Sequence, residues 1–209
     1  GGIIVPLLIG LNLIVWVFAI ERLLTILKAG GKGNISEFIR KVQYHLANKN
    51  VDAALTECDK QKGSVGNVMK AGLHRYKEMI ANTELTTDQK VMAIQKEVEE
   101  ATALELPMLS KNLVFLSTIT SLGTLIALLG TVLGMIDSFN AIEEAGGIKP
   151  TVVAGGIKTA LITTVAGLVV AIILQVFYNV IVAKIDNLVN SMEDASNTFM
   201  KIVKSRLDK

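Results

Sequence analysis

Charged residues are scarce in this chain, and three long stretches lack them altogether. Only 19% of the 209 residues are charged, whereas about a quarter of the residues of a typical soluble domain carry a charge. The uncharged stretches run from 3 to 20, from 113 to 136 and from 159 to 183. Runs of 24 and 25 residues are too long for the faces of amphipathic helices, so they disfavour a soluble protein with buried core helices. Because about 20 apolar residues cross a bilayer as a helix, we expect three membrane spans.

The sequence contains no pattern typical of a catalytic, cofactor-binding or metal-binding site. The single cysteine, Cys58, excludes a disulfide within the chain and is compatible with a reducing compartment. No nucleophile–base pair, phosphate-binding loop or metal-ligand spacing occurs, and we expect His45 and His74 on the surface of helices. A net charge of +2 gives no indication of a nucleic-acid partner. We therefore expect neither an enzyme, nor a cofactor, nor a metal site.

Residues 1–20 are expected to form the first span. A cleaved signal would begin with a basic region and end at a small-residue cleavage site, and neither is present here. Instead, Glu21 and Arg22 follow directly, as expected where a span meets water. We expect them to form a local ion pair that anchors the helix at the membrane surface, with contact to a neighbouring subunit as the alternative.

The distribution of basic residues predicts an orientation in the membrane. Residues 21–112 hold 14 Lys and Arg, and residues 184–209 hold five, whereas residues 137–158 hold only two. Basic segments tend to stay in the cytoplasm. We therefore expect a cytoplasmic helical domain at 21–112, a second span at 113–136, an external loop at 137–158, a third span at 159–183 and a cytoplasmic C-terminal helix at 184–209. The N-terminus then lies outside.

Helix signals continue through the charged segments, and the fold class is all-α. After a break at 29–34, the spacing of Asn34 and Glu37 resembles a capping box, and it predicts a helix that buries Phe38, Val42 and Leu46. Further helices are expected over 51–61 and 67–82.

A second capping box, formed by Thr86 and Gln89, is expected to open one helix that continues from Asp88 to Asp137 with a kink at Pro107. The third span continues to the C-terminus without Gly or Pro in residues 184–209, which predicts a second long helical extension.

Small and hydroxyl-bearing residues recur in the second and third spans. Small residues let helices approach closely in lipid, so we expect them at helix contacts: Gly130, Gly134, Ala160 and Gly167. Hydroxyls can donate and accept hydrogen bonds, and they are candidates to line a proton path, with simple packing as the alternative: Thr124, Thr131, Thr159, Thr163 and Thr164. Since neither span contains Asp, Glu, His, Lys or Arg, a titrating group for proton movement must come from a partner.

Two segments of the chain resemble a known family. "IALLGTVLGMIDSF" and "GGIKTALITTVAGLVVAIILQVFYN" are similar to the second and third spans of the MotA/TolQ/ExbB proton channel family, most closely to ExbB and TolQ. The resemblance implies a ring, usually a homopentamer, in the bacterial inner membrane. It also implies an ExbD-like single-span partner with a membrane aspartate, and a TonB-like protein to which the motor delivers proton-motive energy.

The family's pore threonines correspond to Thr131 and Thr164, and the chain departs from the family pattern nearby. Thr159 replaces a glutamate that is common in ExbB, Gly123 and Thr124 replace an Ala-Pro pair, and Thr163 is an additional hydroxyl. The resemblance therefore leaves open a TolQ-like or gliding-type motor, and the residues alone also leave open a structural membrane scaffold.

Overall fold

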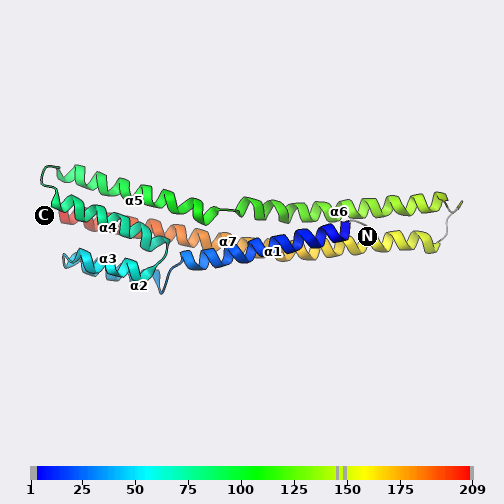
Figure 1. The fold of residues 1–209 in the computed structure, drawn as a ribbon, viewed down its shortest axis with the longest axis horizontal. Coiled ribbons are helices and arrows are strands. Elements are labelled where there is room, and N and C mark those ends of the chain that lie inside the picture. Colours follow the sequence, from blue (N-terminus) through cyan, green and yellow to red (C-terminus); the bar gives the residue numbers. More distant parts are fainter. Residues whose placement is uncertain (1–3, 145, 148–149, 208–209) are drawn as a thin grey trace. The chain divides into compact units, whose positions relative to one another are not determined.

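The computed structural model describes residues 4–144, 146–147 and 150–207, and every regular element in these ranges is an α-helix. The helices follow one another along the chain as shown in Figure 1. They are α1 (Ile4–Ala29), α2 (Ile35–Ala47), α3 (Val51–Gln61), α4 (Ser64–Ala81), α5 (Thr87–Ser110), α6 (Leu113–Glu144) and α7 (Pro150–Leu207).

The chain divides into two compact units. The apolar unit contains Gly1–Arg22 and Asn112–Ile181, and the polar unit contains Leu23–Lys111 and Val182–Lys209. Three helical stretches are long and apolar enough to cross a membrane, and they lie within Ile9–Ala29, Thr87–Glu144 and Val153–Leu207. Because the uncharged runs predicted three spans, this number is confirmed.

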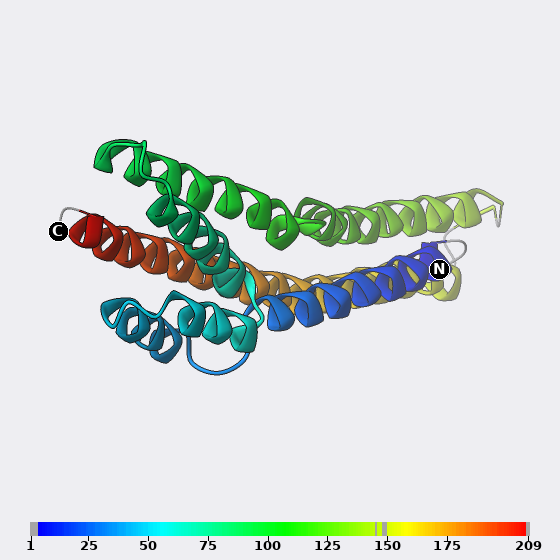
Figure 2. The ribbon, with the colours of Figure 1, turned by 60° about the vertical axis from the view of Figure 1, so that its left-hand side comes forward.

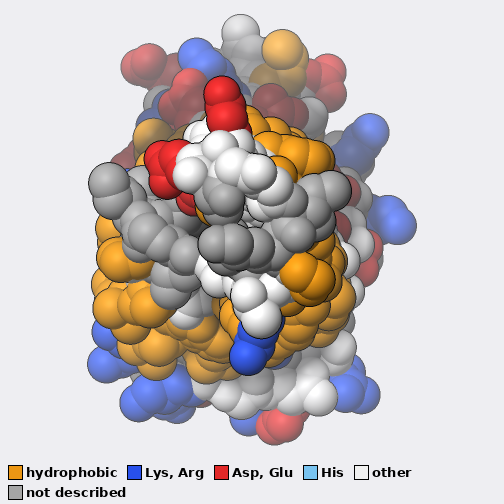
Figure 3. All heavy atoms as spheres, turned by 90° about the vertical axis from the view of Figure 1, so that its right-hand side faces the viewer, with side chains coloured by type: hydrophobic (Ala, Val, Ile, Leu, Met, Phe, Trp, Pro, Cys, Tyr) orange, Lys and Arg blue, Asp and Glu red, His pale blue; other side chains and the backbone are white. Residues whose placement is uncertain are grey.

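In the apolar unit, α1 packs against both α6 and α7 through aromatic side chains. The rings of Trp16 and Phe177 meet edge to face with centroids 5.9 Å apart, and those of Phe18 and Phe115 meet at 5.0 Å. Many large apolar side chains of the three helices point outward, for example Leu13, which is 63% exposed. Hydrophobic side chains also flank the molecular end seen in Figure 3. An exposed apolar surface of this kind is stable only against lipid or another protein.

The polar unit is held together by a core to which its short helices and α7 contribute. Helices α2 and α3 pack on each other, α3 packs on α4, and α4 on α5, and α2 and α3 lie side by side in Figure 2. Phe199 of α7 is fully buried. Its ring contacts Tyr76 edge to face at 6.4 Å, and a Cβ on Gly72 would come within 2.7 Å of it. Glycine at position 72 therefore lets α4 approach this ring.

The short helices largely match the predictions. Phe38, Val42 and Leu46 are buried on one face of α2, and the capping box of Thr86 and Gln89 is present at the start of α5. The predicted box at Asn34 is wrong in its second half. The Asn34 side chain accepts a hydrogen bond from the backbone N–H of Ser36, whereas Glu37 pairs with Lys41 at 2.8 Å.

The prediction of one helix kinked at Pro107 is also wrong. Pro107 lies within α5, which continues to Ser110. The chain then breaks because Lys111 is extended (ψ 136°) and Asn112 adopts a left-handed conformation with φ 62°. Asn tolerates this conformation better than most residues do, so the break falls after the proline, where charged residues give way to the uncharged run.

The helices of the second and third spans extend beyond their uncharged runs. Helix α6 continues to Glu144 and α7 begins at Pro150, so much of the stretch 137–158 is helical. The expected continuation of the third span is confirmed, since α7 is a single helix of 58 residues.

The buried thiol of Cys58 in α3 provides a test of the polar unit. Burial raises the pKa of this thiol to about 12 from an ordinary value of 9.0. Alkylation requires the thiolate, so we expect iodoacetamide at pH 8 to react at least about 100-fold more slowly with the folded chain than with the urea-unfolded chain. Because only the unfolded state loses this proton above pH 9, the contribution of this group to stability falls as the pH rises past that value.

The control for this measurement is Thr56→Cys in a Cys58→Ser background, since Thr56 is exposed on the same helix. This variant should react at the rate of the unfolded chain. Rapid alkylation of Cys58 in the folded protein would contradict the packing of α3 described here.

Candidate functional site

A stripe of small side chains brings α6 and α7 into close contact within the apolar unit. A Cβ built on Gly134 would lie 2.9 Å from the Cβ of Ala160. On the same stripe, a Cβ on Gly167 would overlap the Cβ of Ala127. Glycine in a helix costs roughly 1 kcal/mol relative to alanine, and these contacts explain its use, because larger residues would force the two helices apart.

The contacts follow a regular antiparallel register. Along α6 they involve Ala127, Thr131, Gly134 and Ser138, at intervals of three or four residues, and their partners on α7 are Gly167, Thr164, Ala160 and Gly156. We call these eight residues the small-residue seam. Intervals of three and four keep all contacts on one face of each helix, so the seam is a continuous line of close approach.

The hydroxyls of Thr131 and Thr164 meet at the middle of this seam and form a hydrogen bond. Each hydroxyl also lies near backbone carbonyls: that of Thr131 is 3.3 Å from the Ala127 oxygen, and that of Thr164 is 3.4 Å from the Ala160 oxygen. Both side chains are half-buried. A hydroxyl pair of this kind can both donate and accept hydrogen bonds at one point on an otherwise apolar wall.

The remaining candidate threonines do not join this pair. The hydroxyl of Thr163 donates to the Thr159 carbonyl at 2.9 Å, and the buried Thr163 side chain lines a pocket that α1 also lines. Thr159 donates to the Gly155 carbonyl at 3.1 Å. Thr124 donates to the Ser121 carbonyl at 2.7 Å and lines a separate shallow pocket with Gln175. The predicted set of five hydroxyls is thus divided among different surfaces.

Glu21 and Arg22 form the expected local ion pair. The Arg22 guanidinium donates to both carboxylate oxygens of Glu21, with Nε–Oε2 and Nη2–Oε1 distances of 2.8 Å and 2.6 Å. The Arg22 side chain is only 4% exposed, whereas that of Glu21 is 47% exposed. A buried guanidinium needs a paired acceptor, so this pair places a neutralised charge at the end of the apolar run.

Some residues that shape the site were not singled out from the sequence. Ala127 and Ser138 supply two of the seam contacts, and Asn12 of α1 lines the same pocket as Thr163. The spacing of Ala127, Thr131 and Gly134 could have identified the first. Gly130 is buried in α6, and its role in helix packing stays a prediction. Within the described residues, no group of three His, Cys, Asp or Glu side chains is placed to hold a metal ion.

Comparisons with known proteins agree with this arrangement of apolar spans and polar helices, which is that of a multi-pass membrane protein. The family model "MotA/TolQ/ExbB proton channel family" matches residues 60–194. This chain belongs to that family, whose members are motor-type channel subunits.

Individual relatives support the same assignment. The chain is 28% identical to the biopolymer transport protein ExbB of Pseudomonas putida, over 81% of this chain and 52% of that protein. It is 31% identical to an ExbB of Aquifex aeolicus, over 56% of this chain and 71% of that protein. It is 27% identical to the Tol-Pal system protein TolQ of Pseudomonas aeruginosa, over 66% of this chain and 60% of that protein. Three ExbB-type relatives are covered over only 64%, 40% and 52% of their lengths.

The small-residue seam can be tested with two matched glycine substitutions on α7. Gly167→Ala places a methyl group against Ala127, whereas Gly155→Ala places one in open space. We expect Gly167→Ala to destabilise the protein by about 1–3 kcal/mol through overpacking. Gly155→Ala should be neutral, or up to about 1 kcal/mol stabilising through helix propensity. Unfolding of both variants in detergent, followed by circular dichroism, measures the difference, and equal behaviour of the two would argue against the seam.

Proposed function

We propose that this chain is the ring-forming proton-channel subunit of a motor in the bacterial inner membrane. In this proposal five copies surround an ExbD-like single-span partner, and the complex delivers proton-motive energy to a TonB-like protein that acts on outer-membrane transport. Membership of the proton channel family and similarity to proteins named ExbB support this function. The observation that carries it is the hydroxyl pair of Thr131 and Thr164 in a wall without charged residues.

The proposed orientation places the basic segments in the cytoplasm. The N-terminus then lies on the periplasmic side and the C-terminus in the cytoplasm, with 137–158 as the periplasmic connection. The charge distribution supports this orientation, because the basic residues concentrate at 21–112 and 184–209. With this orientation, the exposed acidic side chains of α5, such as Glu99 and Glu100, would lie in the cytoplasm and raise the local cation concentration.

The absence of Asp, Glu, His, Lys and Arg from the second and third uncharged runs determines the proposed mechanism. A charged carboxylate in hydrocarbon costs at least about 2.5 kcal/mol, and a proton crossing 100 mV releases about 2.3 kcal/mol. A carboxyl group on the partner helix can therefore pass the apolar wall when it is protonated. When it is ionised, it rests beside the hydroxyls, where the Thr164 hydroxyl turns from Thr131 to donate a hydrogen bond to the carboxylate. Each protonation event then permits one step of the partner relative to the ring.

The other candidate threonines have smaller roles in this proposal. Thr124 and Thr159, which lie on other surfaces than the central pair, would add hydroxyls outside this contact, whereas Thr163 would support packing beside α1. The seam residues Gly134, Ala160 and Gly167, together with Gly130, would keep the wall continuous. Glu21 and Arg22 would anchor α1 at the cytoplasmic surface.

A substitution series at the hydroxyl pair tests the function. We expect Thr164→Val to lower proton-driven transport by at least about fivefold, the equivalent of one lost hydrogen bond, while the complex still assembles. Thr164→Ser should retain most of the activity, because it keeps the hydroxyl. The matched control is Thr118→Val, since Thr118 is exposed and its hydroxyl donates to the Val114 carbonyl of its own helix. Proton uptake by liposomes containing the complex measures the effect, and wild-type uptake by Thr164→Val would favour a structural scaffold.

The proposed composition of the complex is tested separately. Mass measurement of the intact complex, extracted in mild detergent, should give five copies of this chain with a small single-span protein whose apolar helix contains an aspartate. Aspartate-to-asparagine substitution in that partner should abolish proton uptake without loss of mass. A complex that contains only this chain would contradict the hypothesis that a partner supplies the titratable group. Co-purification of a Tol-type partner would instead favour the TolQ-like alternative, to which the similarity with TolQ lends support.

A further inference from the structure

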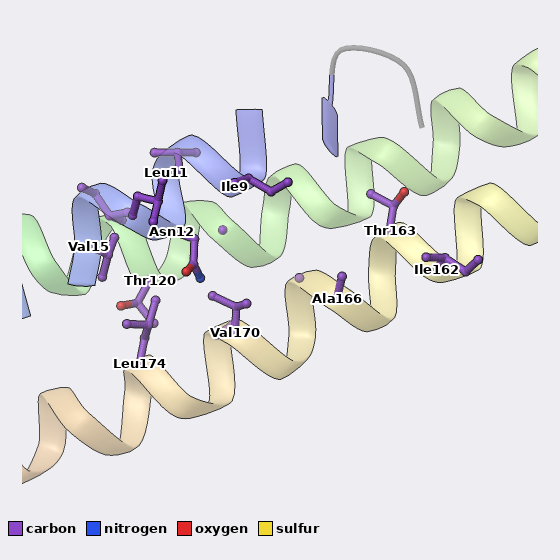
Figure 4. Close-up of a pocket in the computed structure, with 15 residues that line it drawn as sticks. Ile9, Leu11, Asn12, Val15, Thr120, Ile162, Thr163, Ala166, Val170 and Leu174 are labelled. Carbon is purple, nitrogen blue, oxygen red and sulfur yellow. The ribbon is translucent and has the colours of Figure 1, made fainter. Parts of the chain in front are cut away.

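A pocket lies at the junction of α1, α6 and α7, all within the apolar unit. We call it the three-helix pocket. Its volume is about 300 Å³, and the residues on which the argument rests are Asn12, Thr120, Gly123, Thr163, Val170 and Leu174. None of its lining residues is charged, and most are aliphatic. Figure 4 shows Asn12 reaching from α1 into the space above Thr120 and Val170.

The polar groups of this pocket are not equivalent. The hydroxyl of Thr120 donates to the Leu116 carbonyl at 2.9 Å, and that of Thr163 donates to the Thr159 carbonyl at 2.9 Å. Both threonine donors are therefore satisfied. The Asn12 carboxamide forms no hydrogen bond within the part of the chain that the structure describes. It leaves an amide donor at the pocket that requires an acceptor.

The depth of Asn12 restricts the source of this acceptor. Asn12 lies nine residues before Glu21, where the apolar run ends, or about 14 Å along a helix. That distance is close to the middle of a hydrocarbon core about 30 Å thick. Phosphate and ester groups of bilayer lipids lie near the surface and do not reach this depth. A carboxamide without a partner is unfavourable in hydrocarbon, so a molecule that carries an oxygen into the bilayer interior suits the site.

The size of the pocket restricts the molecule further. A cavity of about 150 Å³ holds benzene, so twice that volume accommodates about a dozen non-hydrogen atoms. The aliphatic lining favours an uncharged body, and small-molecule sites typically combine such a lining with a few polar groups that fix orientation. We propose that the three-helix pocket binds a neutral, ring-sized, bilayer-soluble molecule whose carbonyl oxygen accepts a hydrogen bond from Asn12. This site does not depend on the proposed proton pathway.

The natural fluorescence of the chain allows a direct test. Trp16 is the only tryptophan, and it lies one helical turn after Asn12 on α1. Duroquinone is a suitable probe because it has twelve non-hydrogen atoms and two carbonyls, has no free ring position for thiol addition and quenches tryptophan. In liposomes that contain the full chain, we expect saturable quenching of Trp16 with about one duroquinone per chain. Durene, the same methylated ring without carbonyls, should displace it only weakly.

Two pairs of measurements separate the pocket from general partition into the bilayer. We expect Asn12→Leu to weaken duroquinone binding about fivefold, as for the loss of one hydrogen bond, and to leave durene binding unchanged. Val170→Phe fills the pocket and should remove the saturable component. Val169→Phe is its matched control, because Val169 is 52% exposed and does not line the pocket. Helix content and melting temperature of each variant establish that the bundle is intact.

Several outcomes would overturn the proposal. Quenching that rises linearly with duroquinone and is the same in Val170→Phe would show partition into lipid only. Equal weakening of duroquinone and durene by Asn12→Leu would show that the carboxamide shapes the pocket without donating a hydrogen bond. Failure of either probe to bind would show that water or a neighbouring chain fills the space. If Val170→Phe does not fold, the comparison of the two probes on Asn12→Leu still decides the question.

Discussion

The close approach of α6 and α7 is the constraint on which the rest of the apolar unit depends. In lipid there is no hydrophobic gain from joining two apolar helices, so their contact must come from packing at short range. Gly134 and Gly167 permit that range because each faces an alanine. The same closeness brings the hydroxyls of Thr131 and Thr164 within hydrogen-bonding reach. A wider separation would leave each hydroxyl with only the carbonyls of its own helix.

The second and third spans carry hydroxyl groups but no Asp, Glu, His, Lys or Arg. In the proposed motor, this chain and its partner therefore supply different chemical groups. Hydroxyl groups can relay a hydrogen bond but do not hold a proton charge at neutral pH. In the proposed motor, the ring therefore supplies a fixed wall and the partner supplies the charge that moves along it. This arrangement keeps the free-energy cost in lipid low, because a full charge faces the hydroxyls only when the partner carboxyl loses its proton. In this proposal, the chain alone moves no protons.

The sequence was sufficient to predict the helices. It was not sufficient to predict which neighbouring helix each side chain contacts. The uncharged runs predicted three apolar helices, and the caps at Asn34 and Thr86 predicted where α2 and α5 begin, because these signals are local. The division between Thr163 and Thr164 could not be predicted, since it depends on which helix packs against each side of α7. The left-handed residue Asn112 was missed because proline is the stronger local signal, although Pro107 does not end its helix. Ala127 was missed because alanine is common in helices, although its spacing from Thr131 and Gly134 places it on the same face of α6.

The regular register of the small-residue seam has an evolutionary consequence. Each seam position has one partner on the opposite helix, and the space between them is fixed by the neighbouring contacts. A larger side chain at position 127 is then tolerated only while position 167 remains glycine, and the volume at 134 is similarly tied to that at 160. Among diverged members of the family, the summed side-chain volume of each pair should vary less than the volume at either position. The pairing of α6 with α7 should accordingly leave a covariation signal between the two segments.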